Sequence, residues 1–127
     1  MYEVKIEDRF SAAHRLRDCG GKCEALHGHN WKVEVWVGSD SLNAEGMVLD
    51  FAILKELTQK ILETVDHRYL NELPEFCETN PSSENIARYV FERLKADLQH
   101  HPVVLNRVTV WESETACASY FEDNSHD

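Results

Sequence analysis

The segment that decides the fold spans residues 27–37 and reads HGHNWKVEVWV. Within it, Val33, Val35 and Val37 alternate with residues that face the other way. Strict alternation is typical of a β-strand with one buried face, because successive side chains point to opposite sides of the strand. We therefore expect a strand here whose valine side packs against a core.

The residues around this segment predict further strands. Residues 2–15 alternate loosely and carry β-branched and aromatic side chains, which predicts a strand that ends near His14. A loop that reads CGGKC at residues 19–23 separates the two strands. After a turn region, residues 47–50 fit a short third strand.

The hydrophobic period then changes from two residues to that of a helix. The apolar residues at helical spacing in the segment 51–65 are Phe51, Leu54, Leu57, Ile61, Leu62 and Val65. Asp50 is placed to cap this helix. A second helix is predicted to begin at Ser82 or Ser83 and to end near Gln99.

The chain closes with a predicted hairpin over residues 103–111 and 117–121. The order of elements predicts an α+β fold, with an antiparallel four-stranded sheet and two helices on one face. We expect a single domain over residues 1–127, with a polar tail from Glu122 to Asp127. The sheet would keep open edges, so we expect a homo-oligomer.

Charge and composition exclude some functions. The 127 residues hold 13 Lys and Arg against 23 Asp and Glu, a net charge of −10, which argues against nucleic acid as the main partner. The start of the chain does not resemble a signal peptide, and no run of about 18 apolar residues suggests a membrane span. We therefore expect a cytoplasmic protein.

Cysteines occur at positions 19, 23, 77 and 117. Their even number is compatible with disulfides. In a reducing cytoplasm, however, cysteines are more often metal ligands or nucleophiles, which is the interpretation that we prefer.

Three histidines are candidate metal ligands. His27 and His29 flank a glycine, and alternate residues of a strand project to the same face, so both imidazoles can converge on one ion. His14, at the end of the preceding strand, could supply a third nitrogen. Three neutral imidazoles suit Zn²⁺ and leave its fourth position open, as in catalytic sites.

Two other interpretations of these residues remain open. The histidines could be ordinary polar side chains. Alternatively, Cys19, Cys23, His27 and His29 could form a closed structural zinc site, which would use both thiolates and omit His14.

Three further features could take part in catalysis. Cys23 precedes His27 by four residues and could act as a base or nucleophile, although a buried, inert thiol is the simpler alternative. Asp66 could orient His67 for proton transfer, although His67 could also be a histidine at a helix end. Glu112 could accept two hydrogen bonds from the amidine-like edge of a heterocycle, or it could simply lie at the solvated end of a strand.

Six short motifs together carry a resemblance to a known family. They are FSAAH (10–14), CEALHGHN (23–30), DF (50–51), VDHRYLN (65–71), NPSSEN (80–85) and WES (111–113). In this order they resemble the 6-pyruvoyltetrahydropterin synthase family, over essentially the whole chain. The Cys-x3-His-Gly-His spacing resembles the 6-carboxytetrahydropterin synthase (QueD) branch, which acts in queuosine and 7-deazapurine biosynthesis.

The resemblance implies a tunnelling fold, in which several subunits join antiparallel sheets into a barrel with the helices outside. The oligomer would be a hexamer or another multiple of a barrel-forming ring. The resemblance also implies that His14, His27 and His29 bind the zinc.

The resemblance assigns roles to five further residues. It implies that Cys23 is the catalytic thiol, with Asp66 and His67 as its relay partners. It implies that Glu112 anchors the pterin ring and takes part in catalysis, and that Ser83 helps to bind the substrate.

The implied enzyme is a zinc-dependent lyase. It would convert 7,8-dihydroneopterin triphosphate into 6-carboxy-5,6,7,8-tetrahydropterin and release acetaldehyde and triphosphate. A 6-pyruvoyltetrahydropterin synthase or another pterin-processing lyase is the alternative within the family. A non-catalytic, zinc-stabilised binding module is the alternative from another class.

Overall fold

The computed structural model describes residues 1–123, with Lys22 described by its backbone alone. Residues 124–127 of the expected polar tail lie outside this range. The strands are β1 (Tyr2–His14), β2 (His27–Ser39), β3 (Arg68–Tyr69), β4 (Val104–Ser113) and β5 (Ala116–Tyr120). The helices are α1 (Phe51–Leu62) and α2 (Ser83–Asp97), with short 3-10 turns η1 (Gly21–Glu24), η2 (Leu70–Glu72) and η3 (Pro74–Phe76).

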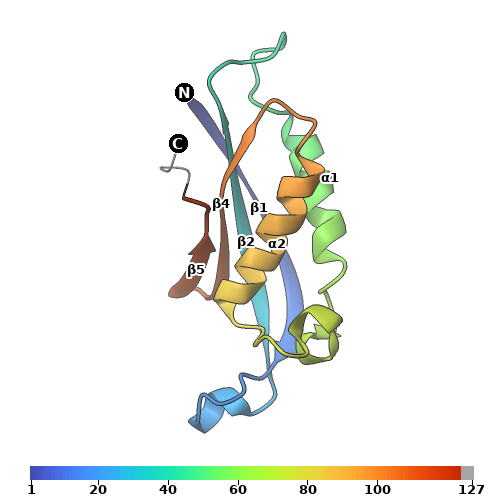
Figure 1. The fold of residues 1–127 in the computed structure, drawn as a ribbon, viewed down its shortest axis with the longest axis vertical. Coiled ribbons are helices and arrows are strands. Elements are labelled where there is room, and N and C mark those ends of the chain that lie inside the picture. Colours follow the sequence, from blue (N-terminus) through green and yellow to red (C-terminus); the bar gives the residue numbers. More distant parts are fainter. Residues whose placement is uncertain (124–127) are drawn as a thin grey trace.

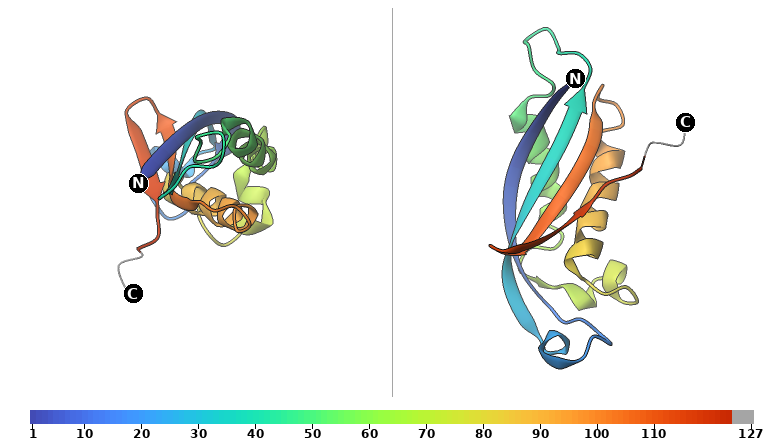
Figure 2. Two further views of the ribbon diagram at one scale, coloured as in Figure 1. Left: turned by 90° about the horizontal axis from the view of Figure 1, so that it is seen from above. Right: turned by 90° about the vertical axis from the view of Figure 1, so that its left-hand side faces the viewer.

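The strands form one sheet in the order β3-β1-β2-β4-β5. All neighbours are antiparallel except β3, which runs parallel to β1. Both long helices cover the same face of this sheet (Figures 1 and 2). The predicted α+β architecture with two helices on one face is therefore confirmed.

Two details of the predicted sheet were wrong. The sheet has five strands rather than four, because the two-residue β3 is too short to show a hydrophobic period. The strand expected at residues 47–50 is irregular instead. Its apolar residues Val48 and Leu49 are buried because the segment packs on the core before α1 begins.

The core lies between the sheet and the helices. On β2 the inward positions Val33, Val35 and Val37 are fully buried, as the alternation predicted. Leu54 of α1 and Val90 of α2 are fully buried in the same cluster. Removing this apolar surface from water is the main term that holds the helices on the sheet.

Both predicted helix starts are confirmed. The Asp50 carboxylate accepts a hydrogen bond from the Ala52 N–H at 2.9 Å, and the Ser82 hydroxyl accepts one from the Asn85 N–H at 3.2 Å. Ser82, rather than Ser83, is therefore the cap of α2. In the part of the chain that the structure describes, no helix has the length and apolar character needed to cross a membrane.

The long ribbon of β1 and β2 positions the candidate site. Its register pairs His14 with His27 and Ala12 with His29. The connection between the two strands, which contains η1, projects beyond the ends of both helices (Figure 1). The three candidate ligands thus gather where the ribbon leaves the helix-covered core.

Candidate metal centre and active site

The three histidines lie close together because of strand parity and register. His14 has the same parity along β1 as the buried Phe10, and His27 and His29 have the parity of the buried Trp31 on β2. All three rings therefore project from the helix-covered face. Their centroids are 4.5 Å apart for His14 and His27, 5.1 Å for His14 and His29, and 4.8 Å for His27 and His29.

Trp31 forms the apolar base of the cluster. Its ring lies edge-on to those of His14 and His29, at centroid distances of 5.0 and 5.1 Å. The indole N–H donates to the backbone oxygen of Ala12 at 3.3 Å, which fixes the ring on the sheet. Trp31 and His14 are fully buried, so water is excluded from this side of the cluster.

Backbone carbonyls orient two of the imidazoles. Nδ1 of His14 lies 2.7 Å from the carbonyl oxygen of Pro81, and Nδ1 of His27 lies 2.7 Å from that of Ala25. A carbonyl oxygen can only accept, so each Nδ1 carries the hydrogen and each Nε2 keeps its lone pair free for a metal.

Two of the buried ring nitrogens lack a hydrogen-bond partner. Among the described residues, Nε2 of His14 and Nε2 of His29 are buried with no such partner. Oε1 of Glu112 lies 3.4 Å from the first and 3.0 Å from the second, but neither contact has hydrogen-bond alignment. An unpaired buried nitrogen is costly unless something else, such as a metal ion, satisfies it.

The donor set fits Zn²⁺. One ligand atom from each of His14, His27, His29 and Glu112 lies within 4.8 Å of all the others. Tetrahedral Zn²⁺ with bonds of about 2.0–2.1 Å places neighbouring ligand atoms about 3.3 Å apart. The two contacts of Glu112, at 3.0 and 3.4 Å, are close to this value.

The electrostatics keep two of these rings neutral. Burial lowers the pKa of His14, and the neighbouring His27 and His29 lower it further. Burial also lowers the pKa of His29, although the Glu112 carboxylate opposes the shift. Only a neutral imidazole can donate its lone pair, so the cluster is poised to bind a metal at neutral pH.

The structure gives Glu112 an unexpected position. From the sequence, we expected the Glu112 carboxylate to accept hydrogen bonds from a heterocycle. In the structure, this carboxylate lies beside His14 and His29. The register between β4 and β5 is irregular between Trp111 and Ser113, directly at Glu112. Periodicity cannot reveal such an irregularity, so no signal in the sequence would have placed Glu112 in the cluster.

Cys23 is not a free thiol in the structure. It lies in η1 and forms a disulfide with Cys19. The two sulfurs are bonded to each other, so the structure does not assemble the closed site of Cys19, Cys23, His27 and His29. The even number of cysteines was the only sequence signal for this disulfide.

Asp66 and His67 form the expected pair, but away from the metal cluster. Oδ1 of Asp66 lies 3.0 Å from Nδ1 of His67 and accepts a hydrogen bond from the Ser11 N–H at 2.9 Å. The Ser11 N–H lowers the pKa of Asp66, and His67 adds to the shift. The Asp66 carboxylate thus attaches the pair to β1 and orients the His67 ring.

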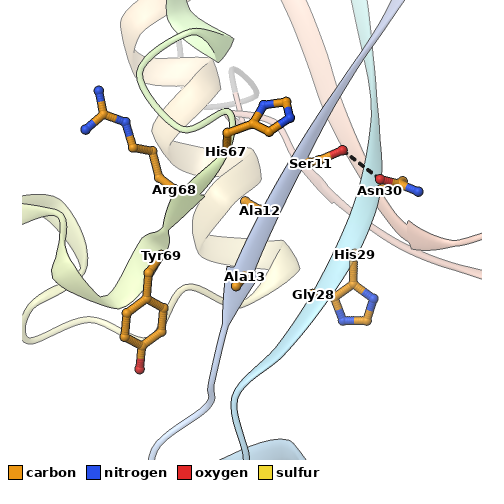
Figure 3. A pocket seen from close by; sticks show the side chains of 9 residues that line it. All are labelled: Ser11, Ala12, Ala13, Gly28, His29, Asn30, His67, Arg68 and Tyr69. Carbon is orange, nitrogen blue, oxygen red and sulfur yellow. Dashed lines mark hydrogen bonds between the residues drawn. The ribbon is translucent and has the colours of Figure 1, made fainter.

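The His67 side chain is 82% exposed. It lines an open hollow of about 540 Å³ that also touches His29. In Figure 3 the two imidazole rings do not point toward one another. A single chain therefore does not bring the His67 ring to the three histidines.

Ser83 lies close to the site along the chain. It is the first residue of α2 and is half-buried, two positions after the Pro81 carbonyl that contacts His14. Because Ser82 caps the helix, the Ser83 hydroxyl is not needed for that purpose.

Comparison with known proteins identifies the family. Residues 3–123 match the family model of 6-pyruvoyl tetrahydropterin synthase. A putative 6-pyruvoyl tetrahydrobiopterin synthase of Caenorhabditis elegans is 40% identical over 126 residues, which cover 89% of each chain. A 6-carboxy-5,6,7,8-tetrahydropterin synthase of Synechocystis is 37% identical over 126 residues, covering 95% of this chain and 94% of the relative.

The solved structures agree with these relatives. The structure of 6-pyruvoyl tetrahydropterin synthase from Caenorhabditis elegans has a TM-score of 0.83 and 36% identity, covering 97% of this chain and 98% of the other. The single chain thus has the subunit architecture of the tunnelling fold that the motifs implied. The chain belongs to the 6-pyruvoyl tetrahydropterin synthase family of pterin-processing lyases.

Proposed function

We propose that this protein is a zinc-dependent 6-carboxy-5,6,7,8-tetrahydropterin synthase. Its substrates would be 7,8-dihydroneopterin triphosphate and water, and its products 6-carboxytetrahydropterin, acetaldehyde and triphosphate. The reaction would serve queuosine or 7-deazapurine biosynthesis, in the cytoplasm.

The observation that carries this proposal is the cluster of His14, His27 and His29 with its two unpaired Nε2 atoms. These nitrogens would hold Zn²⁺. The bound ion would polarise the side-chain oxygens of the substrate and make the adjacent C–H more acidic.

Glu112 would have two successive positions. Without substrate, its carboxylate faces His14 and His29 and would complete the coordination. When substrate oxygens take that place, the carboxylate would be free to accept hydrogen bonds from the amidine-like edge of the pterin. Ser83, at the start of α2, would contribute a hydroxyl to pterin binding.

Protons would be moved by side chains of this chain. The thiolate of reduced Cys23 would remove a proton from the substrate carbon and later return one. His67, oriented by Asp66 at 3.0 Å, would exchange protons with that thiol. Elimination of triphosphate and cleavage of the carbon–carbon bond would follow.

The active site would be shared between subunits. His67 is attached to the outer side of β1 and its side chain is 82% exposed, so it is available to an adjacent copy. The edges of the sheet support such an assembly, because within residues 1–123 β3 covers only Ala12 and Ala13 of β1, and β5 pairs only with β4. We therefore place the Asp66–His67 pair of one copy beside the Cys23 loop of the next.

A 6-pyruvoyltetrahydropterin synthase is the second candidate, which the 40% identity to the Caenorhabditis elegans protein of that name favours. The short Cys-x3-His-Gly-His spacing and the Synechocystis relative favour the 6-carboxy product. Reduced, zinc-loaded protein should be incubated with 7,8-dihydroneopterin triphosphate, and its products separated by mass. Acetaldehyde with 6-carboxytetrahydropterin supports the proposal, whereas a 6-pyruvoyl product or no turnover contradicts it.

Mixed oligomers test the shared site. Cys23→Ser and His67→Gln variants, each inactive alone, should be unfolded together and refolded as a mixture. A shared site predicts that activity reappears, because some interfaces then combine an intact Cys23 with an intact His67. If both residues served one and the same chain, mixing would restore nothing.

A further inference from the structure

The proposed function gives no role to Cys19. Its sulfur forms a disulfide with Cys23, the residue proposed to move protons, and the two Cα atoms are 6.4 Å apart. This separation lies within the range that a disulfide spans without backbone movement. The described chain has two other cysteines, Cys77 and Cys117, which are free and exposed.

The loop is built so that the two cysteines meet. Gly20 and Gly21 have φ values of +72° and +66°, in the left-handed region that favours glycine, and they turn the chain back on itself. A Cβ at either position would meet nothing within 4 Å, so the backbone conformation explains the glycines, and packing does not. The Leu16 N–H then donates to the Cys23 carbonyl oxygen at 2.7 Å and closes the loop.

Arg17 holds the base of this loop. Its guanidinium donates to the carbonyl oxygens of Phe76 at 2.7 Å, Cys77 at 2.8 Å and Thr79 at 3.0 Å. The Asn80 side chain accepts from the Arg17 N–H at 2.9 Å and donates to the Arg17 carbonyl oxygen at 2.9 Å. The base of the cysteine loop is therefore attached to the segment before α2.

The accessibility of the pair suits reaction with a small molecule. Cys19 is exposed and Cys23 is half-buried. None of the residues in the metal cluster is a cysteine, so the disulfide can form and break without removing a ligand. A small disulfide can therefore reach the pair, and thiol–disulfide exchange there would not displace the histidines.

We propose that Cys19 and Cys23 form a reversible modification site for low-molecular-weight disulfides of the glutathione type, with Cys19 as the resolving thiol. Its effect on turnover rests on the proposed catalytic role of Cys23, whereas the formation of the disulfide does not. The disulfide blocks the sulfur that would move protons and protects it from adducts and from further oxidation.

The chemistry balances without another reagent. The Cys23 thiolate attacks one sulfur of glutathione disulfide, which forms a mixed disulfide and releases one glutathione. The Cys19 thiolate then attacks the Cys23 sulfur and releases the second glutathione. The protein exchanges two S–H bonds for one S–S bond and loses two electrons, and the reagent gains them with two protons.

Peptide mass analysis tests the site directly. The reduced protein should be treated with glutathione disulfide and digested with trypsin, which cleaves after Lys22 and so separates the two cysteines into peptides 18–22 and 23–32. These peptides should remain linked, with the loss of two hydrogens and no glutathionyl group. Dithiothreitol should separate them.

Matched variants define the resolving thiol. In Cys19→Ser, Cys23 should instead keep a glutathionyl group, whereas Cys117→Ser should link the two peptides as the parent does. The proposal is overturned if the parent protein forms no 18–22 to 23–32 link, or if Cys23 carries the adduct equally in the parent and in Cys19→Ser.

Turnover gives a separate measurement. The linked form should turn over pterin triphosphate at least about 100-fold more slowly than the reduced form, with unchanged metal content. If the peptides link reversibly and the linked form is as active as the reduced form, the catalytic role of Cys23 fails and the modification site stands. If no link forms in an active enzyme, the modification site fails and the proposed function stands.

Discussion

The metal cluster and the cysteine loop are adjacent parts of one candidate site, but they are built in different ways. His14, His27 and His29 lie on paired strands whose register places the rings together. Cys23 lies on a connection that depends on left-handed glycines and on a bond to Cys19. Regular strands thus provide a fixed position for the metal, and the loop provides a thiol whose availability depends on its oxidation state.

Removing a ligand should have the largest effect. We expect His29→Ala to lower the affinity for zinc by more than about 100-fold, because it removes one of the three imidazole donors and opens the cluster to water. Metal titration with a competing chelator measures this. The exposed His100→Ala is the control and should bind zinc like the parent. Undiminished zinc binding by His29→Ala would remove it from the ligand set.

Removing the thiol should affect turnover and leave the metal. For the reduced protein, we expect Cys23→Ser to lower kcat by about 10²- to 10⁴-fold, the usual contribution of a proton-transfer group, with unchanged zinc content. Cys117→Ser, at a free and exposed cysteine, is the matched control. Loss of zinc in Cys23→Ser together with full retention in His14→Ala would contradict the separation of metal cluster and thiol.

Substitution of Glu112 tests whether its carboxylate binds the metal or the pterin. Glu112→Gln keeps the size of the side chain and removes its charge, so we expect the zinc affinity to fall by about tenfold, less than for a lost imidazole. Glu114→Gln, at an exposed position two residues away, should leave the affinity unchanged. A raised KM with an unchanged zinc affinity in Glu112→Gln would restrict this residue to the substrate.

The stability of the metal-free protein should decrease as the pH is lowered below 6.5. Burial lowers the pKa of His14 and of His29 below the ordinary 6.5, so the unfolded chain binds protons below that pH while both folded rings stay neutral. The free energy of unfolding should therefore decrease as pH falls below 6.5, by up to about 1.4 kcal/mol per pH unit for the fully buried His14. The contribution of these two histidines to the decrease should stop growing once the folded rings also take up protons.

Urea unfolding between about pH 7.5 and about pH 5.5 measures this dependence. His100→Gln should show the same slope as the parent, because His100 is exposed. A free energy of unfolding that is constant or rises as the pH falls would contradict the assignment of neutral, buried histidines.

The regular parts of the fold were predictable from sequence, because each has a period or a cap. The alternation of Val33, Val35 and Val37 predicted β2, and Asp50 and Ser82 predicted the starts of α1 and α2. The helix ends were less accurate. The predicted α1 continued to residue 65, whereas it ends at Leu62, since Val65 is fully buried although it lies in the turn that follows.

The parts of the site that sequence missed depend on irregular backbone. The cysteine pair requires the turn at Gly20 and Gly21, and Glu112 lies at the irregular register between β4 and β5. His67 is separated from the three histidines because its N–H donates to the Ser11 carbonyl oxygen, at the edge of β1 that faces away from β2. None of these features has a hydrophobic period from which it could be inferred.

We propose that the metal is held by nitrogen and oxygen donors while Cys23 stays outside the coordination sphere. X-ray absorption at the zinc edge of the reduced, zinc-loaded protein tests it most directly. We expect only nitrogen and oxygen neighbours, at about 2.0–2.2 Å from the zinc. A sulfur neighbour at about 2.3 Å would contradict it and would restore the closed thiolate–imidazole site.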